Sequence, residues 1–345
     1  MTELPAIRGL VRLLVAAVAI LAAVPVGVAA SPARNARVAI PIERTVLLDG
    51  VVRYSVNIKI GDIGPIPALL DTGSTGLLVL KRALGKKQPR KIGTFSYGYD
   101  SGDTLGGIIS RARISVGGFT TDGGIPFGVV QAQSCMKEKP RCSSGQLKPE
   151  EFGIGGDAIP GEGFAAILGI GIDRNLLPNP IAWSNEAAWI VNLPQPGRPG
   201  PGELILNPDA ADLAGFTMFP IDKSHRKHRG PLRTALPGCL SEPSSGLDVC
   251  GAVTLDTGTP LVVVRMASLP ARPPRPTGQR FDLAFGGEGS ELPLSFQADY
   301  VPPRLISFER ASKEPLPTIH AGVLPYLSYS VYYDFRGGRI GFRQR

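Results

Sequence analysis

A short acidic motif occurs twice in this chain, and each copy lies between apolar runs. Leu70–Thr75 has the sequence Leu-Asp-Thr-Gly-Ser-Thr, and Leu255–Thr259 has the sequence Leu-Asp-Thr-Gly-Thr. Each flanked copy predicts a buried strand, a tight turn that carries a carboxylate, and a second buried strand. Packing alone does not explain an acid at such a junction, because an isolated buried charge is costly. We therefore expect Asp71 and Asp256, 185 residues apart, to form one paired-carboxylate site built from two similar halves.

The rest of the sequence indicates a mainly β protein that is long enough for two domains. Its 345 residues include 43 glycines and 33 prolines, and only 19% of them are charged. Short apolar runs bounded by Gly, Pro, Asn and Asp outnumber long amphipathic stretches, which is typical of β-strands. We expect an N-terminal β lobe over residues 31–190 and a C-terminal β lobe over 191–345, each carrying one Asp-Thr-Gly motif.

Residues 1–30 have the organisation of a secretory signal peptide. Two arginines precede an apolar core, and small residues ending at Ala30 offer a cleavage site. The apolar core is short for a membrane span, although an uncleaved anchor is an alternative, and we expect no membrane span in the mature chain. The protein is thus expected to be exported, either periplasmic or secreted. Residues 31–45 are expected to form a mobile lead-in. Asp71 lies only 41 positions after Ala30, which leaves no room for a sizeable prosegment.

The four cysteines occur as two close pairs, Cys135 with Cys142 and Cys239 with Cys250. Three pairings are open to four cysteines, and the local pairing is the simplest. Each local disulfide would hold a loop in place in an oxidising compartment. Metal binding is the competing interpretation. We expect no metal, because neither pair has Cys-x-x-Cys spacing and no histidine lies near either pair in the sequence.

The net charge of +8 is only moderately basic. The basic residues form short clusters without interleaved aromatic residues, whereas binding to nucleic-acid bases commonly uses aromatic stacking. His225 and His228 lie within such a cluster, where repulsion between cations disfavours a metal site. We expect solvated basic loops, no nucleic-acid partner and no cofactor.

These motifs together resemble those of the pepsin-like aspartic proteases, in the form of a bacterial-type exported member. The resemblance covers about Tyr54 to Phe342. It includes both Asp-Thr-Gly motifs, a Tyr-Gly pair at Tyr97 in a predicted hairpin, an Ile-Leu-Gly element at Ile167–Gly169, and a closing hairpin. The second cysteine pair also sits where family members often have a disulfide. The resemblance implies a bilobed, pseudo-twofold β fold with a substrate cleft between the lobes.

The resemblance also implies roles for individual residues. Asp71 and Asp256 would share one proton and activate a water that attacks the peptide bond of a peptide or protein substrate. The residues implied to support this dyad are Thr72, Gly73, Ser74, Thr257, Gly258 and Thr259. The residues implied to cover the substrate from a flap hairpin are Tyr97, Gly98, Tyr99 and Asp100. A monomer suffices, because one chain carries both half-sites.

Some residues depart from the family pattern. Leu78 stands where the family often has a tryptophan that supports the flap tyrosine, and the second apolar-apolar-Gly element reads His-Ala-Gly at His320. The flap tip carries an added residue, so Tyr99 is an alternative to Tyr97 as the functional tyrosine. We expect Asp100 in the flap to tolerate a basic substrate side chain beside the scissile bond. These departures leave an alternative open, a catalytically weak or inactive pepsin-fold protein that binds peptides or proteins.

Overall fold

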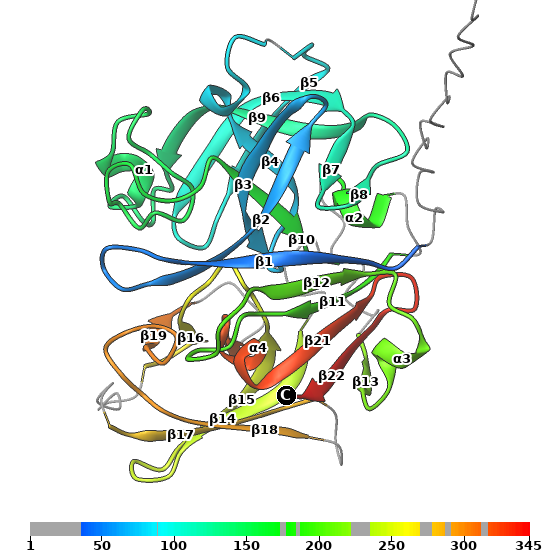
Figure 1. Cartoon of the computed structure of the whole chain (residues 1–345). Coiled ribbons are helices and arrows are strands. Elements are labelled where there is room, and N and C mark those ends of the chain that lie inside the picture. Colours follow the sequence, from blue (N-terminus) through cyan, green and yellow to red (C-terminus); the bar gives the residue numbers. More distant parts are fainter. Residues whose placement is uncertain are drawn as a thin grey trace, which may run out of the picture. The chain divides into compact units, whose positions relative to one another are not determined.

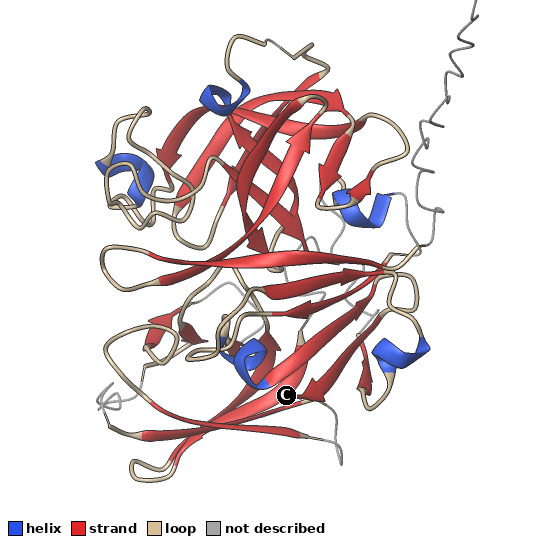
Figure 2. Ribbon diagram, viewed as in Figure 1, coloured by secondary structure: helices blue, strands red, loops and turns tan. Residues whose placement is uncertain are grey.

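The computed structural model describes residues 36–87, 89–172, 177–183, 187–221, 235–269, 278–286, 291–311 and 317–345. These residues form mainly β-strands, with a few short helices (Figure 2). The predicted signal peptide and the cluster that holds His225 and His228 lie outside the described residues. Among the residues that are described, no helix has the length and apolar character needed to cross a membrane.

The first half of the described chain carries ten strands and three helical segments. The strands are β1 (Val38–Val46), β2 (Val52–Ile60), β3 (Ile63–Asp71), β4 (Thr75–Leu80), β5 (Gly93–Gly98), β6 (Asp103–Ala112), β7 (Ile114–Val116), β8 (Phe119–Thr120), β9 (Ile125–Cys135) and β10 (Ala166–Ile170). The helical segments are η1 (Lys81–Leu84), α1 (Ser143–Gln146) and α2 (Pro180–Trp183).

The second half carries the remaining described elements. The strands are β11 (Ala188–Asn192), β12 (Gly202–Leu206), β13 (Thr217–Pro220), β14 (Leu236–Glu242), β15 (Leu247–Thr254), β16 (Val262–Met266), β17 (Arg280–Phe285), β18 (Leu292–Gln297), β19 (Ile306–Arg310), β20 (Thr318–His320), β21 (Tyr329–Asp334) and β22 (Arg339–Gln344). The helices are α3 (Ala210–Leu213) and α4 (Leu324–Ser328).

The described strands form two sheets. The larger sheet has the order β13-β22-β21-β11-β12-β1-β2-β3-β10-β4-β9-β6-β5, with β7 and β8 attached through β2, and the smaller has the order β18-β17-β14-β15-β20-β16-β19. Figure 1 shows β1 passing between the strands of the two halves, and the pairing agrees, because β1 joins β2 on one side and β12 on the other. The predicted boundary at residues 190 and 191 falls inside β11 and stays a prediction.

Both Asp-Thr-Gly motifs lie in the same local arrangement of strands. In the first half, β10 lies between β3 and β4, parallel to β3 and antiparallel to β4. In the second half, β20 lies between β15 and β16 in the same two orientations. The two strands that flank each motif are therefore separated by a third strand, and the turn between them crosses the end of that strand. The apolar runs around each motif supply these buried strands, as the sequence predicts.

Residues 38–45 form a strand, so the expectation that they belong to a mobile lead-in is wrong. Strand β1 pairs with β12 from Val38 to Ile42 and with β2 beyond that. The side chains of Ile40 and Ile42 are buried. Their alternation with exposed neighbours is the period of a half-buried strand, a signal that is present in the sequence.

Both disulfides have the local pairing that the sequence favours. Cys135, at the end of β9, is bonded to Cys142 with a Cα–Cα distance of 5.6 Å. Cys239 on β14 is bonded to Cys250, which lies directly opposite on β15. The disulfide occupies both sulfur atoms of the second pair, so they are not available to bind a metal with the adjacent Asp248. Two disulfides are compatible with an exported protein.

Ile42→Ala tests whether β1 is part of the core. The side chain of Ile42 has no exposed surface, so its truncation should lower the free energy of unfolding by about 2–5 kcal/mol, measured by denaturant titration. Val46→Ala is the matched control in the same strand, because Val46 is 52% exposed, and it should change stability by less than about 0.5 kcal/mol. Equal effects of the two substitutions would contradict the burial of β1.

Candidate active site

The two acidic turns approach each other so closely that each needs a glycine. A Cβ atom added to Gly73 would lie 2.6 Å from either carboxylate oxygen of Asp256. A Cβ atom added to Gly258 would lie 2.8 Å from Oδ1 of Asp71. The space that each glycine leaves empty is therefore bounded by the carboxyl group of the opposite turn. The structure thus brings together the two acids that the sequence predicts as a pair.

Each turn hydrogen-bonds its own carboxylate in the same way. The backbone N–H of the motif glycine donates to Oδ1 of the acid, at 2.8 Å for Gly73 and 2.7 Å for Gly258. The next hydroxyl group donates to Oδ2, from Ser74 in the first turn and from Thr259 at 2.7 Å in the second. These donors fix the orientation of both carboxyl groups before any ligand binds.

The two threonines of the motifs join the turns to each other. The N–H of Thr72 donates to Oγ1 of Thr257 at 3.1 Å, and the N–H of Thr257 donates to Oγ1 of Thr72 at 3.0 Å. Both threonines are buried. Thr257 also donates its hydroxyl hydrogen to the carbonyl oxygen of Leu70 at 2.7 Å. Because these bonds are reciprocal, one turn cannot shift without breaking bonds to the other.

A buried pair of tyrosines lies next to this junction. The hydroxyl group of Tyr326, on α4, is 2.7 Å from Oγ1 of Thr72 and contacts the hydroxyl group of Tyr333 on β21. Burial raises the pKa of Tyr326 well above its ordinary value and that of Tyr333 to about 12, so both hydroxyl groups keep their hydrogens. Tyr326 is not predicted from the sequence, because no motif marks it and its partner Thr72 is 254 residues away.

The surroundings of Asp71 favour its protonated form. Burial is the largest cause that raises the pKa of Asp71 well above 3.8, followed by the charge of Asp256 and a side-chain hydrogen bond with it. The hydrogen bonds from Ser74 and Gly73 act in the opposite direction but do not cancel these effects. The pair therefore retains a proton at a higher pH than an isolated carboxyl group does.

The hairpin of β5 and β6 carries two tyrosines over the acids. The rings of Tyr97 and Tyr99 lie 4.8 Å apart, and both line a cavity of about 250 Å³ together with Asp71 and Asp256. Burial, and then the charge of Asp71, raises the pKa of Tyr99 well above 10, so its hydroxyl group remains a hydrogen-bond donor within electrostatic reach of the acids. Tyr99 is thus a real alternative to Tyr97 as the functional tyrosine.

A leucine, Leu78, supports this hairpin at the position where the resemblance implies a tryptophan. Leu78 is 4% exposed and belongs to an apolar cluster that also contains Phe95 and Leu105 from the hairpin. Tyr97 and Tyr99 pack against the same cluster. The position of Leu78 therefore still supports the flap, through apolar packing.

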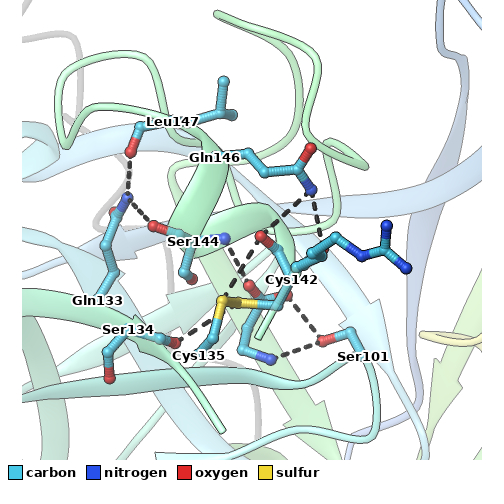
Figure 3. Close-up of a disulfide and its surroundings, with 10 residues drawn as sticks. Ser101, Gln133, Ser134, Cys135, Cys142, Ser144, Gln146 and Leu147 are labelled. Carbon is cyan, nitrogen blue, oxygen red and sulfur yellow. Dashed lines mark hydrogen bonds between the residues drawn. A yellow bond between two sulfur atoms is a disulfide. The ribbon is translucent and has the colours of Figure 1, made fainter. Parts of the chain in front are cut away.

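The segment around the first disulfide holds the tip of the flap. Figure 3 draws Ser101 of the tip among the residues around the disulfide of Cys135 and Cys142. The N–H of Ser144, on α1 just beyond Cys142, donates to Oδ1 of Asp103 at 2.7 Å, and the hydroxyl group of Ser101 donates to Oδ2 of Asp103 at 2.8 Å. This support for the flap has no recognisable sequence signal.

Arg53 links the first half of the chain to the second acidic turn. Its guanidinium group is almost fully buried and donates to the carbonyl oxygen of Gly258 at 2.8 Å. It also donates to the carbonyl oxygen of Gly155 at 3.0 Å and pairs with Asp157 at 2.6 Å. Arg53 is not predicted from the sequence, because a charge near a strand end is ordinary and its partners are distant in the chain.

The comparisons with known proteins bear on the fold. No protein-family model matches the chain, and no curated protein does either. Among solved structures, the chain is similar to an aspartic proteinase from Irpex lacteus, with a TM-score of 0.57 and 17% sequence identity over 90% of this chain and 97% of that chain. The described chain thus has the mainly β, bilobed pepsin-like fold that the sequence predicts. At this identity the similarity shows the fold and leaves the activity to be inferred from the site.

The structure gathers the predicted dyad, its supporting residues and the flap residues around one cavity. That cavity is lined by both acids, by Gly73, Ser74, Gly258 and Thr259, and by Tyr97 to Asp100. Thr72 and Thr257 lie at the contact between the turns, and the cysteines lie in disulfides. The catalytic and substrate-binding roles of these residues stay predictions.

Gly73→Ala tests the close approach of the two turns. The added Cβ atom would be 2.6 Å from the Asp256 oxygens, so the turns must separate, and we expect a loss of about 1–3 kcal/mol in the free energy of unfolding. Gly123→Ala is the matched control, because a Cβ atom there meets nothing within 4 Å. Thermal unfolding of the two variants checks this, and an unchanged melting temperature in Gly73→Ala would contradict the contact.

The raised pKa of Asp71 predicts a pH dependence of stability. The folded chain holds this proton to a higher pH than the unfolded chain, whose carboxyl pKa is near 3.8. Protonated Asp71 therefore contributes fully to the free energy of unfolding below about pH 4. This contribution is lost as the pH rises through the raised pKa. Asp71→Asn cannot ionise, so its melting temperature should rise relative to wild type between about pH 4 and pH 7. Asp62→Asn, at an exposed carboxyl group, is the control, and a difference independent of pH would refute the assignment.

Proposed function

We propose that this protein is an aspartic endopeptidase that hydrolyses peptide bonds with a water activated between Asp71 and Asp256. The observation that carries the proposal is the reciprocal approach of the two turns, in which each glycine leaves room for the opposite carboxyl group. Burying two acids against each other is costly, so the packing of the two turns does not by itself explain the pair. The similarity to a fungal aspartic proteinase supports the same reaction.

The chemistry follows from a pair that holds one proton. The ionised carboxylate takes a proton from water as the water oxygen attacks the carbonyl carbon of the peptide. The protonated carboxyl group donates to the carbonyl oxygen, and a proton then passes to the leaving nitrogen. The raised pKa of Asp71 supports a protonated partner. Because the pair titrates as a unit, the roles of acid and base are assigned to the dyad and not to single residues.

The surrounding groups orient the reaction. The hydroxyl donors on Ser74 and Thr259 keep the two carboxyl groups from rotating, so that they face one water between them. Tyr99 offers a hydroxyl hydrogen to the substrate from above the acids, and the flap excludes bulk water. The disulfides support the further proposal that the protein works outside the cytoplasm.

Substitution of either acid tests the proposal. Asp71→Asn and Asp256→Asn should each lower kcat/KM for peptide cleavage by at least about 10²–10⁴-fold, because each removes one half of the acid–base pair. The measurement is cleavage of a quenched-fluorescent peptide across acidic pH, with and without pepstatin. Asp62→Asn should leave the rate unchanged.

The outcomes separate the two candidate functions. Cleavage that survives both substitutions would contradict the dyad. Purified protein that binds peptides but cuts none at any pH would instead be the catalytically inactive peptide-binding protein.

A further inference from the structure

A charged cluster crosses the cleft beside the two acids. It joins the flap tip, through Asp100, to two strands of the second half, through Arg265 on β16 and Glu309 on β19. Nη1 of Arg265 lies 3.2 Å from Oδ2 of Asp100, and Nε of Arg265 lies 3.2 Å from Oε2 of Glu309. The guanidinium group of Arg265 thus binds one carboxylate from each side of the cleft.

The sheet holds Arg265 in place. Its side chain is 10% exposed and lies on β16, directly opposite Glu309 on β19 and Thr318 on β20. Nη1 is also 3.3 Å from Nε2 of His320, whose Nδ1 is 3.2 Å from Oγ1 of Thr254. Because these neighbours all lie on strands of one sheet, Arg265 and His320 stay in position when the flap moves.

Asp100 is held far less firmly. Its side chain is 61% exposed and sits at the tip of a hairpin. The carboxylate of Asp100 can return to water when it leaves Arg265, so a competing carboxylate can take its place. The backbone of Asp100 has a contact of its own, in which Nζ of Lys139 donates to its carbonyl oxygen at 2.6 Å.

The cluster adjoins the candidate dyad. Asp100 and His320 line the cavity of about 250 Å³ that contains both acids. They also line a second cavity of about 480 Å³, together with Arg265, Glu309 and Gly258. Because Asp100 lines both cavities, a peptide that extends from one cavity into the other displaces Asp100 from Arg265.

We propose that Arg265 and His320 form a carboxylate-binding subsite, which Asp100 occupies in the free protein and which an Asp or Glu side chain of the substrate occupies in the complex. This depends on the proposed function, since the subsite belongs to the same cleft. Withdrawal of Asp100 removes one negative charge from around Arg265, and a substrate carboxylate restores a charge-assisted hydrogen bond. A basic substrate side chain, which Asp100 alone favours, would meet the guanidinium group of Arg265 instead.

Matched peptides test the subsite on the wild-type protein. The substrates are quenched-fluorescent octapeptides with two apolar residues at the centre. Asp or Asn is placed at one of four positions, which are the two before and the two after the apolar pair. At one position, kcat/KM for the Asp peptide should exceed that for the Asn peptide by about tenfold or more, the range of a hydrogen bond to a charged group. Equal rates at all four positions would overturn the proposal.

Two variants test which residues bind the carboxylate. In Arg265→Gln, the Asp-to-Asn ratio should fall toward one, whereas Arg280→Gln, at an exposed arginine paired with Asp282, should keep it. Because Arg265 is nearly buried, a second variant tests the same subsite from the exposed flap tip. Asp100→Asn removes the competing carboxylate and should lower KM for the Asp peptide several-fold more than for the Asn peptide. An equal change for both peptides would contradict the competition.

Binding measurements separate this inference from the proposed function. The affinities of fluorescently labelled Asp and Asn peptides for the wild-type protein are compared by anisotropy, which needs no cleavage. If no peptide is cut at any pH, the proposed function fails, yet a tighter Asp peptide would still support the subsite. If peptides are cut but both bind equally, the subsite is wrong while the proposed function stands. Failure of both peptides to bind also overturns the subsite.

Discussion

The fold depends on the contact between the two Asp-Thr-Gly turns. Two carboxyl groups brought together in a buried site repel each other when ionised, so the chain must supply enough donors to hold them there. Glycine amides and hydroxyl groups supply these donors within each turn, and Thr72 and Thr257 exchange hydrogen bonds between the turns. Arg53 and Tyr326 add bonds from the surrounding strands and helix. The rest of the architecture places these few polar groups against one another.

The local pattern of the sequence predicts much of this. The flanked acidic motifs give the buried strands and the paired acids, because each depends on residues that are close in the chain. Contacts between the two halves are not predicted by this local pattern. Arg53 meets Gly258 across 205 positions, and Arg265 meets Asp100 across 165. Before folding, such residues are indistinguishable from ordinary solvated charges. The alternation of apolar and polar residues in β1 is visible in the sequence and indicates a strand, so the expected mobile lead-in is a wrong interpretation of that pattern.

The two halves share one strand arrangement but differ in what it presents. At equivalent places in the central strand, the first half has the buried Ile167, opposite Leu78, and the second has the partly exposed His320, opposite Val263. Ile167 belongs to the apolar cluster that supports the flap tyrosines. His320 lines the second cavity next to Arg265. The pseudo-symmetry therefore builds the acid pair, and the departures from it give the cleft one apolar and one charged side.

Strand β1 also bears on how the chain reaches this structure. It is among the first described residues to emerge during synthesis or export, yet Val38 pairs with Leu206, far along the chain. Until β12 has been synthesised, β1 lacks its pairing partner on one edge, and the isoleucines of β1 that are buried in the folded chain have only part of their packing. This long-range closure raises the contact order, which slows folding. Completion of the larger sheet is therefore a late event, and the lobes gain their full stability together.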